Sequence, residues 1–289
     1  MAVNLSVLDL FSGIGGFSLG LDRAIVPNAP RFKTVAFCEA DEYCRRVLGH
    51  HWPRVPCYPD VRHLGLADFL RDGVALPDVI CFGFPCTDIS LAGPGGGLSG
   101  ARSGLWFEGL RIIEETRPTW VIVENVPALR SRGLDIVLGG LAALRYDAEW
   151  NCIPAAALGA PHRRDRIWIV AYPEGVGCRA GRQGRLTDGL AWISDAPRWN
   201  PSNTDRQGYP ERQGVGGDAR QEQSAAERSP CLDVWKSEWP AEPALCGMDD
   251  GLSDGVDLGL YALGNSLISG IAEAHGRVIL HYEMTKSIR

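Results

Sequence analysis

The residue best suited to covalent chemistry is Cys86, in the stretch ICFGFPCTDISLAG. It follows Pro85 directly, where an apolar run gives way to the glycine-rich segment PGGGLSGARSG. α/β enzymes place reactive groups on loops that leave the C-terminal ends of parallel strands. A thiolate is a strong nucleophile near neutral pH, so the position favours nucleophilic catalysis. A purely structural role for an isolated Pro-Cys pair stays open at this point.

A second group of residues has the spacing of a nucleotide-binding turn. Gly13, Gly15 and Gly16 follow the first apolar run in VLDLFSGIGGFSLGL, and glycine permits a sharp turn close to a ligand. Glu39 lies 26 residues after Gly13, near the spacing at which an acid meets ribose hydroxyls. A second acid, Asp60 in CYPDV, could accept from an adenine amino group. The dinucleotide fingerprint GxGxxG is incomplete, because a serine occupies its sixth position.

An alternation of strands and helices can position these groups. Short apolar runs predict strands at 5–11, 34–38, 78–82, 119–123, 149–153 and 167–171. Helical patterns fill most of the intervening stretches, at 17–25, 41–48, 64–71, 105–116 and 134–144. Such alternation predicts an α/β fold with a mostly parallel sheet and helices on both faces.

The chain divides near residue 172. Residues 1–172 form the expected catalytic and cofactor-binding domain, and 173–248 form a variable region poor in aliphatic residues up to about Pro230. That region is either an insert without stable structure or a loop-rich module that orders on a partner. Residues 249–289 are expected to return to the first domain, with a helix at 266–282.

Composition narrows the possible functions. The net charge of −6 argues against a nucleic-acid partner, but eleven arginines lie between residues 160 and 230. Arginine suits phosphates and guanine edges, although a codon bias toward arginine also explains the three lysines of the chain. Nine cysteines without a CxxC pair indicate reduced thiols and no metal site. No apolar run reaches membrane-spanning length and no secretion signal is evident, so we expect a cytoplasmic protein.

Five motifs occur in one order along the chain: DLFSGIGGF, GFPC, WVIVENV, GAPHRRDRIWIVA and YALGNSLISGIAEA. Together they resemble the cytosine-5 DNA methyltransferase family over residues 3–172 and 235–282. The resemblance implies a Rossmann-like fold that depends on S-adenosylmethionine. It also implies methyl transfer to carbon 5 of a cytosine flipped out of duplex DNA, through a covalent bond between cysteine and carbon 6. The variable region lies where this family keeps its target-recognition region.

The resemblance assigns three catalytic residues. Cys86 is expected to attack carbon 6, Glu124 to protonate or hydrogen-bond ring N3, and Arg164 to approach the cytosine O2. Glu124 is also consistent with a buried acid paired within the sheet. Arg166 is expected to pair with a carboxylate, and Asn125 to fix the loop rather than to touch the base. Three departures from the family pattern lie outside the central chemistry. His162 and Thr87 occupy positions at which the family commonly has glutamine, and no Pro-Gln follows the terminal Gly-Asn.

The resemblance also assigns the cofactor contacts. Phe11 is expected at the cofactor, although it is equally consistent with plain core packing. The full set of expected S-adenosylmethionine contacts is Phe11, Gly13 and Gly15 at the methionine and adenosine moieties, Glu39 at the ribose, Asp60 and Val61 at the adenine, Leu105 as a cover and Asn265 at the amino-acid end.

Other functions fit the sequence less well. A tRNA-methylating branch of the family carries Cys-Phe-Thr in its variable region, and this chain has no such tripeptide. A catalytically silent DNA-binding protein is disfavoured by the intact Pro-Cys and Glu-Asn-Val motifs. An NAD oxidoreductase would leave these motifs unexplained, and enzymes that methylate amino groups use an Asp/Asn-Pro-Pro-aromatic loop instead. The expected partner is double-stranded DNA, bound by a monomer with a possible cognate restriction endonuclease. Composition does not give the recognition sequence or the host.

Overall fold

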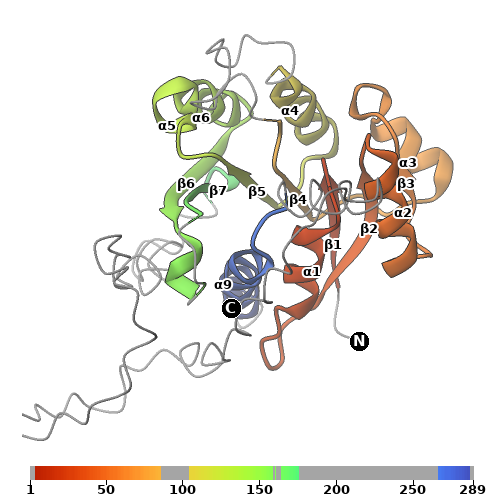
Figure 1. The fold of residues 1–289 in the computed structure, drawn as a ribbon, viewed down its shortest axis with the longest axis horizontal. Helices are drawn as coiled ribbons and strands as arrows, with labels where there is room; N and C mark the ends of the chain where they lie inside the picture. Colours follow the sequence, from red (N-terminus) through yellow and green to blue (C-terminus); the bar gives the residue numbers. More distant parts are fainter. Residues whose placement is uncertain (1–3, 86–103, 159, 161–163, 176–265, 287–289) are drawn as a thin grey trace, which may run out of the picture.

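The computed structural model describes residues 4–85, 104–158, 160, 164–175 and 266–286. These residues form a seven-stranded sheet of order β3-β2-β1-β4-β5-β7-β6 (Figure 1). The strands are β1 Leu5–Leu10, β2 Phe32–Cys38, β3 Cys57–Tyr58, β4 Val79–Phe82, β5 Trp120–Asn125, β6 Tyr146–Ile153 and β7 Arg166–Pro173. The α-helices are α1 Gly16–Arg23, α2 Glu42–His51, α3 Leu66–Asp72, α4 Leu105–Thr116, α5 Leu129–Arg132, α6 Leu134–Ala143 and α9 Ser269–Lys286, and the 3-10 turns are η1 Val61–His63 and η3 Ala155–Leu158.

The sheet is mixed but mostly parallel. β1 runs parallel to β2 and β4, β4 runs parallel to β5, and β2 runs parallel to β3. β7 is antiparallel to both of its neighbours, β5 and β6. The predicted fold class is therefore confirmed, and β7 reverses direction within it.

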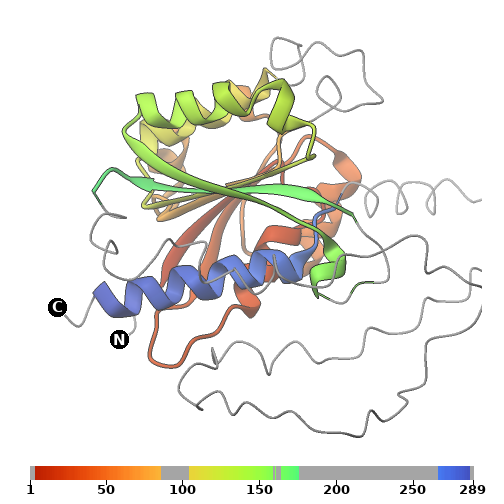
Figure 2. The same cartoon turned by 90° about the vertical axis from the view of Figure 1, so that its left-hand side faces the viewer.

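Helices cover both faces of the sheet (Figure 2). One apolar cluster packs α3, α4 and α6 against one face, and the other packs α1 and α9 against the opposite face. The residues of β5 alternate between the two clusters, with Val121 and Val123 in the first and Trp120 and Ile122 in the second. Burial on both faces explains why this strand is a continuous apolar run.

The C-terminal helix α9 packs closely against α1. A Cβ atom on Gly20 would lie 2.3 Å from the carbonyl oxygen of Ser269, and one on Gly276 would lie 2.8 Å from the Cβ of Ala24. The two glycines therefore allow a helix separated by about 250 residues of sequence to lie beside α1. No helix among the described residues is long and apolar enough to cross a membrane.

Most predicted elements are found, with changed ends. β6 begins at Tyr146 and β7 ends at Pro173, because the two strands pair along their whole length. The polar residues Asp147 and Asn151 belong to this edge strand, although they interrupt its apolar pattern. β3, α5, η1 and η3 were not predicted, because two to four residues carry too little periodicity.

Candidate active site

The predicted site residues that the structure describes gather at one edge of the sheet. β1, β2, β4 and β5 are parallel, so their carboxyl ends share an edge, and the antiparallel β7 begins there. Most predicted site residues fall in the described part of the chain. Cys86 and Asn265 lie outside it, as do His162 and Thr87, but Pro85 and Ser266, next to the first two, are described.

The glycine turn after β1 is built from left-handed backbone. Phe11, Gly13 and Gly15 have φ angles of 51°, 54° and 86°. A Cβ atom on Gly15 would lie 2.7 Å from the ring of Trp52, so packing excludes any side chain there. A Cβ atom on Gly13 would meet no heavy atom within 4 Å. The turn is thus packed at Gly15 and open at Gly13, as a site for a close-approaching ligand requires.

Phe11 is partly buried against the core cluster, and its ring centroid lies 6.3 Å from that of Phe82. Both of its expected roles, core packing and contact with a ligand at the turn, fit this position.

Glu39 joins the glycine turn to the end of β2. Its carboxylate accepts hydrogen bonds from the backbone N–H of Gly13 at 2.7 Å and from that of Asp41 at 2.8 Å. A carboxylate has about four lone-pair positions, so two of them remain for further donors. The side chain therefore lies beside the turn, where an acceptor for ribose hydroxyls is expected.

A buried acid beneath the turn was missed by the sequence analysis. Asp9 is fully buried, and its Oδ2 accepts hydrogen bonds from the hydroxyl of Ser18 at 2.8 Å and from its N–H at 3.3 Å. No group among the described residues donates a hydrogen bond to its Oδ1. Burial raises the pKa of Asp9 to about 8, while the Ser18 hydrogen bonds oppose the shift. Asp9 is therefore mainly protonated at pH 7 and caps the first turn of α1. The pattern that could have indicated Asp9 is a single acidic residue within an otherwise apolar strand.

The expected adenine side of the site is the turn after β3. Asp60 accepts hydrogen bonds from the guanidinium of Arg62 at 2.8–3.2 Å, and these hold the pKa of Asp60 at about 2. Arg62 was not expected there. Val61 is 5% exposed and lies in the core cluster. Leu105, the first residue of α4, packs against the same cluster.

Glu124 is the last residue but one of β5 and lies in a desolvated setting. Its side chain is 13% exposed, and its Oε1 lies 2.9 Å from the Nε of Arg166, which confirms the expected pairing of Arg166 with a carboxylate. Desolvation raises the pKa of Glu124 to about 7, against the opposing charges of Arg166 and Arg164. Near neutral pH this carboxyl group can therefore either donate or accept a proton.

The chain that leads to Cys86 is fixed beside Glu124. A Cβ atom on Gly83 would lie 3.0 Å from the Oε2 of Glu124. The Nδ2 of Asn125 donates to the carbonyl oxygen of Phe84 at 3.1 Å, and its Oδ1 accepts from the N–H of Val126 at 2.9 Å. Asn125 thus fixes the loop, as expected.

Arg164 has a contact that the sequence did not indicate. Its Nη2 donates to the carbonyl oxygen of Ser266. Ser266 follows Asn265 in the sequence and comes shortly before the start of α9 at Ser269. Burial lowers the pKa of Arg164, and its φ angle is 34°. Arg164 therefore joins the surroundings of Glu124 to the chain entering α9.

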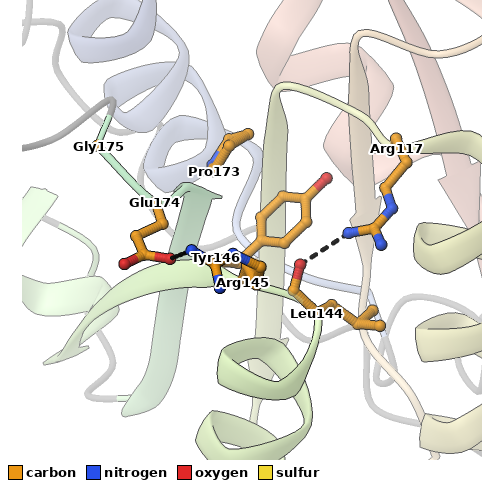
Figure 3. A pocket seen from close by; sticks show the side chains of 7 residues that line it. All are labelled: Arg117, Leu144, Arg145, Tyr146, Pro173, Glu174 and Gly175. Atoms are coloured by element: carbon orange, nitrogen blue, oxygen red, sulfur yellow. Dashed lines mark hydrogen bonds and ion pairs between the residues drawn. The ribbon is translucent and has the colours of Figure 1, made fainter.

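A hollow of about 610 Å³ lies at the opposite edge of the sheet, between the start of β6 and the end of β7 (Figure 3). Its arginines have partners: Arg117 donates to the carbonyl oxygen of Leu144 at 2.7 Å, and Arg145 pairs with Glu174 at 2.7 Å. Of the predicted site residues that have described positions, none lines it. Within the described residues, no group of three or more His, Cys, Asp or Glu side chains could hold a metal ion.

Comparisons with known proteins give a consistent relationship. A family model described as C-5 cytosine-specific DNA methylase matches residues 5–206. Type II methyltransferase M2.BsuMI of Bacillus subtilis (strain 168) is 33% identical over 177 residues, which cover 58% of this chain and 42% of that protein. Type II methyltransferase M.CviJI of Paramecium bursaria Chlorella virus IL3A is 33% identical over 170 residues, which cover 58% of this chain and 43% of that protein. The matched part thus spans less than half the length of either relative.

The solved structure of the Entamoeba histolytica methyltransferase EhMeth has a TM-score of 0.51 to this chain. Its sequence identity is 14%, and the match covers 59% of this chain and 53% of that one. At this identity the likeness concerns the fold alone.

Proposed function

Because the chain belongs to the C-5 cytosine-specific DNA methylase family, we propose that it transfers a methyl group from S-adenosylmethionine to carbon 5 of cytosine in DNA. One observation carries the proposal. At the edge of the sheet that holds the glycine turn, the desolvated carboxyl group of Glu124 lies beside two groups. One is the chain that leaves β4 toward Cys86, and the other is the guanidinium of Arg166.

The residues present fit the cofactor. The open face of Gly13 allows close approach, and Glu39 retains acceptor positions for ribose hydroxyls. The resemblance assigns the adenine to the Asp60–Val61 turn, where Arg62 already donates to the Asp60 carboxylate. Phe11, Gly15, Leu105 and Asn265 complete the proposed contacts. When bound, S-adenosylmethionine supplies an electrophilic methyl group.

The protein residues make carbon 5 reactive. The thiolate of Cys86 adds to carbon 6 of the cytosine, and the proton of the Glu124 carboxyl group goes to ring N3, so that charge does not build up on the ring. Carbon 5 then carries enamine character and accepts the methyl group. Loss of the proton at carbon 5 expels the thiolate of Cys86, and the N3 proton returns to Glu124, so that the neutral aromatic ring and the starting form of the enzyme are both restored. Arg166 holds Glu124, and Arg164 orients the base through O2.

The target base must leave the duplex stack to reach this edge of the sheet. We assign recognition of the DNA sequence to residues 173–248, whose arginines suit phosphates and guanine edges. The further proposals are a cytoplasmic monomer and, from the Type II names of the relatives, a role beside a restriction endonuclease.

Transfer of tritiated methyl groups from S-adenosylmethionine to duplex DNA tests the activity, and bisulfite sequencing of DNA from expressing cells reads the methylated position. We expect 5-methylcytosine at one sequence. Methylation of tRNA but not DNA would contradict the substrate, and methylation of an amino group would contradict the chemistry. A chimera with residues 173–248 of a relative should methylate the relative's sequence; methylation of the original sequence would contradict the recognition assignment.

A further inference from the structure

Arg111 on α4 uses all three of its guanidinium nitrogens, and one of them joins α4 to η1. Its Nη2 donates to the carbonyl oxygens of Val61 at 3.0 Å and Leu64 at 2.8 Å, both in or next to η1. Its Nε and Nη1 pair with Glu108 at 2.9 Å and Glu115 at 2.7 Å on its own helix. The side chain is 34% exposed, so these bonds are partly shielded from water. A planar guanidinium with fixed donor directions can satisfy all four acceptors at once.

The network extends from Arg111 to the next helix. The Oε2 of Glu115 accepts from the N–H of Leu66, the first residue of α3, at 2.9 Å. A Cβ atom on Gly65 would lie 2.7 Å from the same oxygen, so a larger residue there would displace the Glu115 carboxylate. The chain from Val61 to Leu66 is thus held to α4 at three backbone groups.

Arg71 provides a contrast within the same region. It pairs with Asp68 and Asp72 on α3, and its side chain is 63% exposed. Its ion pairs lie within one short stretch of chain, and exposed pairs of this kind contribute little to stability. Arg71 therefore serves as a matched control for an arginine with two carboxylate partners.

We propose that Arg111 is a positioning residue that holds the adenine side of the cofactor pocket in place. This rests on the proposed function, in which Asp60 and Val61 meet the adenine and Leu105 covers it. Leu105 begins the helix that carries Arg111, and Arg111 fixes the η1 turn to that helix. Arg111 therefore keeps the two walls of the adenine pocket at a constant separation without touching the cofactor itself.

Calorimetry on the full chain with S-adenosylhomocysteine and S-inosylhomocysteine tests this role. The inosine analogue changes only the adenine edge, so the ratio of the two dissociation constants reports how well the turn is placed. In Arg111→Leu we expect S-adenosylhomocysteine to bind about tenfold more weakly, as is typical when support for a binding group is lost, with the preference over the inosine analogue falling toward one. Arg71→Leu should leave affinity and preference within about twofold of wild type.

Arg111→Lys keeps the charge but cannot donate to two carbonyls and two carboxylates together, so its preference should be intermediate. If Arg111→Leu does not fold, the affinity and ligand preference of Arg111→Lys provide the test instead. Unchanged affinity in a folded Arg111 variant would overturn the proposal. An equal loss for both ligands would also overturn it, because that pattern indicates a general loss of structure. If the wild-type chain bound neither ligand, the proposed function would fall, and this role with it.

Discussion

Asn125→Asp is the change that most sharply tests how the chain before Cys86 is held. The side chain of Asn125 is buried, and its two ends make different hydrogen bonds. An aspartate keeps the acceptor for the N–H of Val126. It loses the donor to the carbonyl oxygen of Phe84 and places a second oxygen about 3.1 Å from it. The substitution is nearly isosteric, so packing is preserved.

The size of the effect follows from these contacts. A buried carbonyl group left without its donor costs about 1–3 kcal/mol. If a loss of about 2 kcal/mol falls on the segment that places Cys86, the methyl-transfer step slows about 30-fold. Cofactor binding should change little, because the glycine turn follows β1, whereas the side chain of Asn125 bonds to Phe84 and Val126 within the described part of the chain.

Single-turnover methyl transfer to duplex DNA measures the rate, and calorimetry with S-adenosylhomocysteine measures binding. Asn151→Asp on the edge strand β6 is the control, because it introduces the same charge at a partly exposed position. A rate for Asn125→Asp within twofold of the control would refute the argument that Asn125 holds this segment.

The other predictions concern the acids of the site. Glu39→Ala should weaken S-adenosylhomocysteine binding about 10–100-fold in calorimetry, since bonds to a charged group contribute about 1.5–3 kcal/mol; unchanged affinity would remove Glu39 from the pocket. Glu124→Gln should slow single-turnover methyl transfer about 10²–10⁴-fold while Glu114→Gln on the exposed face of α4 does not, and equal rates would exclude proton donation by Glu124. The pKa of Asp9 is raised from 3.8 to about 8. Between these two pH values the folded chain holds a proton that the unfolded chain releases. The free energy of unfolding should therefore fall as pH rises from about 4 to about 8, by up to about 1.4 kcal/mol per pH unit. Asp9→Asn should remove this fall in urea titrations at pH 5 and pH 8; equal pH dependence in both proteins would contradict the shift.

Much of the site could be predicted because parallel strands bring distant residues to one edge. Glu39 and Glu124 each end an apolar run, and the positions of such runs are readable from local pattern. The α4 helix, Leu105–Thr116, was predicted with both ends correct, since its apolar residues recur at helical spacing.

The features that were not predicted depend on which elements are neighbours. No local pattern shows that β7 inserts between β5 and β6 in the opposite direction, and that insertion brings Arg166 to Glu124. The bonds of Arg111 to η1 span about 50 residues, and the protonation of Asp9 depends on complete burial. Asp60 and Arg62 are close in the sequence, so their ion pair does not depend on distant elements. An acid and a base at this spacing also fit a solvent-exposed turn, so the sequence alone did not predict the pair.

The central claim is that Cys86 forms a covalent bond to carbon 6 of the target cytosine, and trapping that bond tests it most directly. The wild-type chain is incubated with S-adenosylmethionine and a duplex carrying 5-fluorocytosine at the methylated position. Fluorine at carbon 5 blocks the final elimination, so a complex that survives denaturation should accumulate. Peptide mapping should find the nucleotide on Cys86, and Cys86→Ser should form no adduct while still binding S-adenosylhomocysteine. An adduct on another of the nine cysteines, or methylation by Cys86→Ser at near the wild-type rate, would contradict the account.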